Sequence, residues 1–263
     1  MQKLLKISLP LILIFFFSYC GSDINAKDIH ATIYLSRILG SSEAELDLAY
    51  HSGPVGSFTI DEVWVNNKMI AQPKKRATAS VGGNGFVYRA EGVSLKEKAQ
   101  LDENKRDIKI KTKWTGESQR EFVLNYNLPS LFKVASVSNT ISKTQALKLE
   151  LKDALSKKDW DSCSVEFSEK LKEAAGKSPW HGSVGLFSKD NNGDQLKNIE
   201  VLLSQIEKQS TAQLPQELYF QLRCVKEFKN PEKRIAQGDT YLFTQNSFRY
   251  ELKTKRYQLT IRE

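Results

Sequence analysis

Histidine, methionine, cysteine and proline are all scarce in this chain of 263 residues. The three histidines, His30, His51 and His181, have no second histidine four residues away and no cysteine at ligand spacing, so the sequence predicts no zinc site. The glycine loop Val81 to Gly85 is followed by a strand pattern, so it lacks the helix N-terminus that makes such loops bind phosphate. We therefore expect no metal and no cofactor.

Long apolar runs are also missing, except for one near the start of the sequence. Lys3 and Lys6 precede an apolar run from Leu9 to Phe17 that only Pro10 interrupts. A basic segment followed by about 7 to 15 apolar residues is typical of an export signal. The run is shorter than the roughly 20 residues that cross a bilayer. We predict that residues 1–26 are a signal peptide and tether that lie outside the fold.

Cys20 follows the apolar run directly, in the order Phe17-Ser18-Tyr19-Cys20. Bacteria attach diacylglycerol to a cysteine in this place, so the segment resembles a lipobox. Its phenylalanine-rich run resembles that of spirochaetal envelope lipoproteins of the Leptospira type, over residues 1–23. The resemblance implies lipidation at Cys20 and a place in the bacterial envelope, at the outer membrane. Because Tyr19 stands where a small residue is usual, cleavage after Ala26 is the alternative, which gives a periplasmic or secreted protein.

Two further cysteines, Cys163 and Cys224, remain once Cys20 is set aside. Each belongs to an alternating apolar series. The first series is Cys163, Val165 and Phe167, and the second is Leu218, Phe220, Leu222 and Cys224. Alternation with period two is typical of strands, so both thiols would lie on apolar faces. Export leads to an oxidising compartment. We predict a disulfide between Cys163 and Cys224.

Charge is spread through the whole chain, with 39 Lys and Arg against 31 Asp and Glu and a formal net charge of +8. No segment concentrates the lysines, which is typical of a solvated surface. Export also argues against nucleic acid as a partner. The expected partners are a membrane, through the lipid anchor, and a protein or polysaccharide ligand.

Period-two alternation dominates the first half of the chain. The clearest series are Ile29 to Leu35, Ala44 to Tyr50, Phe58 to Val65, Phe86 to Ala90, Ile108 to Trp114 and Phe122 to Tyr126. A change of parity between Ile60 and Val63 predicts a β-bulge, and Asn66-Asn67 predicts a tight hairpin turn. Ser94 and Glu97 have the spacing of a capping box and predict one helical turn. About seven strands in some 100 residues are typical of an immunoglobulin-like β-sandwich.

A second β-rich domain is predicted after the linker Asn127 to Ser130. Strand patterns return at 132–137, 146–151, 163–167, 218–224, 241–243, 248–252 and 257–261. Glu169 to Ala175 predicts a short helix that ends at Gly176, whereas Leu196 to Ile206 fits helix and strand spacing alike. We predict a mainly β protein of two tandem immunoglobulin-like β-sandwich domains, 27–129 and 130–263, the first able to fold alone and the second with one or two short helices.

Three local patterns suggest chemistry, and each fits an ordinary structural role better. His181-Gly182-Ser183-Val184-Gly185 resembles a nucleophile elbow but lacks its first glycine and the helix after the serine. Asp190 to Asp194 alternates oxygen side chains as a calcium loop does, but its glycine and its final ligand are out of place. Trp64, Trp160 and Trp180 are expected in or near the core, although tryptophans also form sugar platforms.

These features favour a non-enzymatic envelope lipoprotein that acts as a binding, adhesion or structural module through loops held on rigid sandwiches. No catalytic residue is predicted. The alternative is a glycan-acting enzyme or an accessory carbohydrate-binding protein. That alternative requires Trp180, His181, Asp190 and Asp194 to gather in one pocket.

Overall fold

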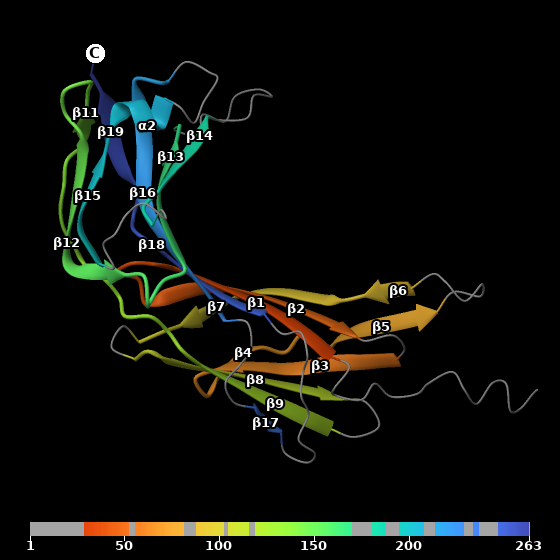
Figure 1. Cartoon of the computed structure of the whole chain (residues 1–263). Helices are drawn as coiled ribbons and strands as arrows, with labels where there is room; N and C mark the ends of the chain where they lie inside the picture. The colour runs from red at the N-terminus through yellow and green to blue at the C-terminus, as the bar shows by residue number, and fades with distance from the viewer. Residues whose placement is uncertain are drawn as a thin grey trace, which may run out of the picture.

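The computed structural model shows a mainly β protein whose strands form three sheets. The residues described are 29–52, 56–81, 88–102, 105–115, 119–169, 180–187, 195–207, 214–228, 234–236 and 247–262. Figure 1 shows two lobes that meet at an angle. Within these ranges, no helix has the length and the hydropathy of a membrane span.

A nine-stranded sheet runs through both lobes. Its strands, in spatial order, are β11 (Thr140–Ile141), β19 (Tyr257–Ile261), β16 (Glu217–Phe228), β18 (Ser247–Lys253), β1 (Ile29–Ile38), β2 (Glu43–Ser52) and β7 (Val93–Gln100), with β13 (Ser162–Ser168) paired to β16 and β14 (His181–Gly185) paired to β13. β1 and β18 are parallel neighbours, with Thr32 opposite Ser247 and Ile38 opposite Lys253. Main-chain hydrogen bonds therefore join the two halves of the chain within one sheet.

A seven-stranded sheet covers one face of the first-lobe part of the long sheet. Its strands are β17 (Arg234–Ala236), β9 (Gln119–Asn127), β8 (Asp107–Thr115), β3 (Gly56–Val65), β5 (Lys75–Val81) and β6 (Tyr88–Glu91), with β4 (Lys68–Ala71) paired to β3. Alternate residues of both sheets fill the space between them. The hydroxyls of Tyr50 on β2 and Thr112 on β8 lie 2.7 Å apart inside this core, so a buried hydrogen bond joins the two layers.

A three-stranded sheet covers the second-lobe part in the same way. It consists of β10 (Val134–Val137), β12 (Leu147–Ser156) and β15 (Gln195–Val201). A short helix, α2 (Leu203–Glu207), follows β15 and buries Leu203 and Ile206. The core of this lobe is rich in aromatic rings, and Trp160 stacks on Tyr250 with 5.8 Å between ring centroids.

The buried residues of the two lobes form one continuous cluster, and β18 contributes to both ends of it. Phe248 stacks on Tyr126 of β9, with ring centroids 4.0 Å apart, whereas Tyr250 packs against Trp160. The predicted sandwich-like, mainly β architecture is confirmed. The division of the chain near residue 129 stays a prediction, and the β1–β18 ladder crosses that position.

Several local predictions for the first lobe are confirmed. The register of β3 against β8 shifts between Ile60 and Glu62, which is the predicted bulge. Asn66 and Asn67 form the turn between β3 and β4 with positive φ angles of 48° and 66°, which asparagine tolerates better than most residues.

The helical turn predicted from Ser94 and Glu97 is wrong, because these residues belong to β7. Val93, Leu95 and Ala99 point into the core, and the alternate exposed positions are polar, namely Ser94, Lys96, Lys98 and Gln100. The capping-box spacing occurs here by coincidence, and burial of the alternating apolar face decides the conformation.

The segment Leu196 to Ile206, which fitted both helix and strand spacing, contains a strand and a helix, since β15 ends at Val201 and α2 begins at Leu203. Three further predictions lie outside the described residues. They are the helix 169–175 beyond its first residue, the strand 241–243 and the glycine loop beyond Val81.

The predicted disulfide is present. Cys163 on β13 and Cys224 on β16 are directly opposite each other in an antiparallel pair, with Cα atoms 4.1 Å apart. Both side chains are buried, as the alternating pattern predicted.

Candidate functional site

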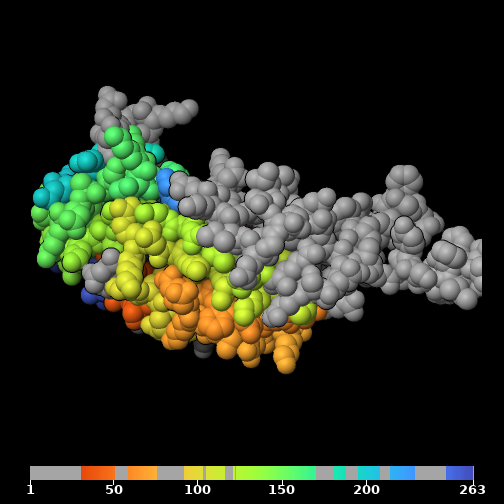
Figure 2. Space-filling view, turned by 90° about the horizontal axis from the view of Figure 1, so that it is seen from below, coloured from red at the N-terminus to blue at the C-terminus, as the bar shows by residue number. Residues whose placement is uncertain are grey.

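A hollow of about 870 Å³ lies at the end of the first-lobe sandwich where β3 and β9 end. Five of its lining residues carry side-chain amides, which are Asn66, Asn67, Gln100, Asn125 and Asn127. We call it the amide hollow. Figure 2 shows this side of the molecule, where yellow atoms of the chain near residue 100 lie between the orange atoms of the first lobe and the green atoms of the second.

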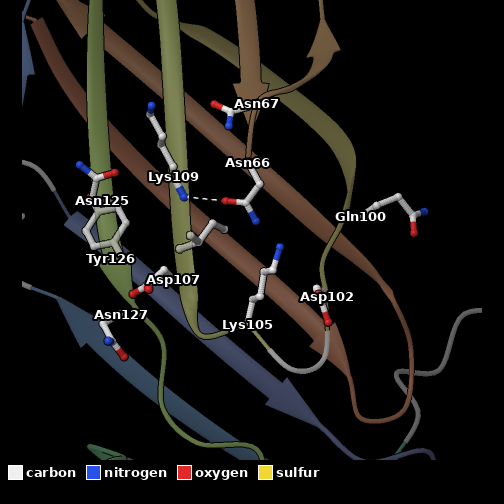
Figure 3. Close-up of a pocket in the computed structure, with 11 residues that line it drawn as sticks. Asn66, Asn67, Gln100, Asp102, Lys105, Asp107, Lys109, Asn125, Tyr126 and Asn127 are labelled. Carbon is white, nitrogen blue, oxygen red and sulfur yellow. Dashed lines mark hydrogen bonds between the residues drawn. The ribbon is translucent and has the colours of Figure 1, made fainter.

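Asn66 is fixed by the strand beside it. Its Oδ1 atom accepts a hydrogen bond from the main-chain N–H of Lys109 on β8, at 2.9 Å (Figure 3). The N–H of Asn66 donates in return to the carbonyl of Lys109, also at 2.9 Å. The hairpin turn is therefore tied to β8, which holds the wall of the hollow in place.

The other four amides are free to bind. Asn67, Gln100, Asn125 and Asn127 make no side-chain hydrogen bond to any residue that the structure describes. Asn125 and Asn127 are alternate residues of β9 and share one face of the strand. Each amide offers two N–H donors and one carbonyl acceptor. The hollow thus presents several donors and acceptors around its wall without a strong charge of one sign, since Asp102, Asp107, Lys105 and Lys109 balance one another around it.

A charged cluster lies on the polar face of the long sheet, where the two lobes meet. Its centre is Glu251, whose side chain is completely buried. Arg223 donates from Nε to the Oε2 atom of Glu251 at 2.8 Å, and Lys253 forms an ion pair with the same carboxylate. Arg223 also donates to Glu166 on β13 at 2.9 Å, so one guanidinium joins two carboxylates.

The electrostatics of the charged cluster favour ionised Glu251. Burial by itself would raise the pKa of this carboxyl, but hydrogen bonds from Arg223, Lys253 and Tyr34 outweigh burial and hold its pKa below the usual range. The pKa of Tyr34 is raised to about 12 by burial and by its hydrogen bond to Glu251. Glu251 is therefore ionised at neutral pH, and its donors hold it within the sheet.

The residues predicted for a glycan pocket are only partly described. Trp180 is half-buried and packs against the core, whereas His181 is exposed at the start of β14. Asp190, Asp194 and the predicted calcium loop lie outside the described residues. Ser183 is in the middle of β14, opposite Glu166, and so lacks the strand-to-helix turn of a nucleophile elbow.

The other tryptophans differ in setting. Trp160 is buried, as expected, and Trp64 lies half-buried on the outer face of the seven-stranded sheet, where the Lys111 ammonium is 4.5 Å from its ring centroid. Among the described residues, no group of three or more His, Cys, Asp or Glu side chains could hold a metal ion. Cys20 and the side chains of His30 and His51 are outside the described part of the chain.

The amide hollow was missed by sequence reasoning. Asn66 and Asn67 were assigned to a turn and Asn127 to a linker, which are the ordinary places for asparagine. One signal was available, since Asn125 and Asn127 alternate at the end of a strand and must share a face. Their meeting with Asn67 depends on the pairing of β3, β8 and β9, which local pattern does not specify.

No protein-family model matches this chain, and no curated protein matches it. Among solved structures, the mu homology domain of Fcho1 from Danio rerio with bound Eps15 peptide is similar over 93% of this chain and 99% of that one, with 10% identity and a TM-score of 0.29. The yeast delta-COP-I mu-homology domain complexed with a Dsl1 WxWxV peptide covers 89% of this chain and 96% of its own, at 9% identity and a TM-score of 0.24.

Red sea bream transglutaminase is a third similar structure, at 10% identity and a TM-score of 0.23. The match covers 91% of this chain and 32% of the transglutaminase chain. TM-scores this low do not indicate a shared function.

Proposed function

We propose that this protein is a non-enzymatic binding module of a bacterial envelope, held at the outer membrane by lipid on Cys20, and that it binds a polysaccharide at the amide hollow. The observation that carries the proposal is a set of four amides around one hollow, those of Asn67, Gln100, Asn125 and Asn127, whose side chains make no hydrogen bond to any described residue. Sugar hydroxyls both donate and accept hydrogen bonds, and side-chain amides offer both functions within one planar group.

The chemistry of the hollow favours a sugar over an apolar peptide side chain. Most of the lining side chains are polar, and the aromatic ring of Tyr126 is largely occupied by its stacking on Phe248. A peptide ligand would gain little from such a hollow, because apolar anchors need apolar pockets. A polysaccharide can replace the water on the amides with its own hydroxyls.

The position of the tether supports access to the hollow. Ile29, the first residue of β1, stands nine positions after Cys20, and an extended chain spans about 30 Å over this distance. β1 then runs for 10 residues, about 33 Å, away from that point. Its far end lies beside Ala44 of β2, and the neighbouring Glu43 is paired with Gln100 of the amide hollow. An anchor at Cys20 would therefore connect to the start of β1, whereas the hollow lies beside the far end of that strand.

The test is binding of the full chain, in a neutral detergent, to dextran, mannan, galactan and polygalacturonate, measured by calorimetry. At least one polymer is expected to bind. Replacing Asn125 and Asn127 together with alanine should weaken that binding about tenfold or more, since each lost hydrogen bond contributes roughly 1 kcal/mol. Both side chains lie on the outer side of β9, so the fold should tolerate the change.

The matched control is Asn198→Ala, an exposed asparagine on β15 in the other lobe. It should leave the affinity unchanged. Asn67→Gly adds a third check, because glycine keeps the positive φ of the turn and removes only the amide. Equal affinity in the parent chain and in the Asn125/Asn127 variant would exclude the amide hollow as the binding site.

A further inference from the structure

The connection between β18 and β19 is a bulge in the long sheet, and it aims cationic side chains at the polar face. Both strands pair with β16, with Arg223 opposite Lys253 and Phe220 opposite Tyr257. Between these pairs, three residues from 254 to 256 stand opposite two residues of β16. Bulges of this kind redirect side chains and are frequent beside functional sites.

The bulge is a built feature of the sheet. Thr254 is buried, and its Oγ1 atom accepts a hydrogen bond from the N–H of Leu222 at 3.0 Å. The N–H of Thr254 donates to the carbonyl of Leu222 at 2.9 Å, so the ladder is satisfied at this point. Lys255 and Arg256 are left exposed on the surface.

Two hollows adjoin the bulge and share Gln221, Lys253 and Arg256 in their linings. The larger one, about 580 Å³, is called the bulge hollow. Its polar lining is completed by Glu166, Ser168, His181 and Ser183 from β13 and β14. The smaller one, about 420 Å³, extends toward β1 and β2 and includes Glu43.

The ion pairs leave positive charge uncompensated in the bulge hollow. Glu166 and Glu251 are both occupied by Arg223, and Lys253 pairs with Glu251. In the part of the chain that the structure describes, no carboxylate forms an ion pair with Arg256. Its guanidinium can therefore bind a carboxylate of a ligand through two parallel hydrogen bonds.

We infer that the bulge hollow is an anion subsite, and that the polysaccharide bound by this protein is an acidic one that carries carboxylates. The inference rests on the proposed function and extends it. A ligand chain could pass from one site to the other along the polar face, because Glu43 of the smaller hollow is the cross-strand partner of Gln100 of the amide hollow. Arg256 would bind the carboxylate, and the hydroxyls of Ser168 and Ser183 would bind the sugar around it.

An acidic peptide fits this hollow less well than an acidic sugar. The side chains that line it from the outer face are hydroxyl, amide, imidazole and charged groups. Phe167 and Phe220 are buried beneath it and offer no pocket for an apolar residue. The hollow therefore suits a ligand that is polar along its whole length.

The experiment compares two forms of one polymer, polygalacturonate and its fully methyl-esterified derivative, on the full chain in neutral detergent. The free acid should bind at least tenfold more tightly, and added salt should reduce that difference. Arg256→Gln should weaken binding of the free acid by about fivefold to tenfold and leave the ester unchanged. Arg262→Gln, an exposed arginine beyond the end of β19, is the control and should have no effect.

The possible failures are distinguishable. Equal binding of acid and ester, or equal loss in the Arg256 and Arg262 variants, would overturn the anion subsite and leave the amide hollow standing. Dependence on Arg256 without dependence on Asn125 and Asn127 would overturn the amide hollow and keep the subsite. Binding of poly-glutamate through Arg256, with no binding of polygalacturonate, would show that the ligand is an acidic peptide and would overturn the inference.

Discussion

Glu251 is a carboxylate with no exposure to solvent on a sheet face that is otherwise polar and hydrated. Three donors hold it. Arg223 on β16 and Tyr34 on β1 lie on neighbouring strands, and Lys253 lies on its own strand. Because its pKa in the folded state lies below the ordinary value of 4.5, the unfolded chain binds more protons as the pH falls toward that range. The stabilisation is present above pH 4.5 and is lost as the pH falls through the folded pKa.

Glu251→Gln should therefore lower the free energy of unfolding at pH 7 by about 1 to 3 kcal/mol, since Arg223 and Lys253 lose a charged partner but can still reach water. The loss should shrink as the pH falls below about 4.5, because the parent chain gives up the same stabilisation there. Urea unfolding of both proteins across this pH range measures the difference.

Glu43→Gln is the matched control, because Glu43 pairs with Lys98 at the surface, with both side chains well exposed. Surface pairs contribute about 0 to 1 kcal/mol, so this variant should stay close to the parent at every pH. A Glu251→Gln variant with an unchanged free energy of unfolding at pH 7 would contradict the role assigned to the charged cluster.

At the scale of elements, the disulfide joins β13 to β16 in the middle of the long sheet. It closes a loop of 61 residues, which in the chain-entropy account stabilises the fold by about 4 kcal/mol. Replacing Cys163 and Cys224 together with alanine should lower the free energy of unfolding by roughly 2 to 5 kcal/mol. The urea midpoint of unfolding measures this change.

Reducing agent provides the control for the disulfide prediction. It should destabilise the parent chain and leave the double alanine variant unaffected. If the parent chain and the variant unfold at the same urea concentration, the cross-link contributes nothing to stability and the prediction fails.

The proposed lipid on Cys20 precedes β1 by nine positions, so it would hold the complete folded protein at the membrane. Cells that express the full chain should incorporate labelled palmitate into it, and Cys20→Ala should abolish that label. The Cys163/Cys224 double alanine variant should keep the label, which separates lipidation from other cysteine chemistry. A mature protein that begins at Lys27 would refute the anchor and favour the periplasmic or secreted alternative.

Features that depend on near neighbours along the chain can be predicted from the amino-acid pattern alone. Alternation of apolar residues identified most strands, and the parity of Cys163 and Cys224 predicted that both lie on buried strand faces, because successive strand residues point to opposite faces. The turn at Asn66 and Asn67 followed from the tolerance of asparagine for positive φ. The helical turn predicted from Ser94 and Glu97 is wrong, because the alternation of Val93 and Leu95 in β7 outweighs a short capping-box pattern.

Which strands pair across the two halves of the chain cannot be predicted from local pattern and is seen in the folded structure. The ladder between β1 and β18 joins residues more than 200 positions apart, and each strand taken alone would fit several partners. The amide hollow and the bulge hollow both result from such pairings, because their side chains come from strands that are distant in sequence. Register between strands is a property of the packed core, so the pattern of a single strand cannot specify it.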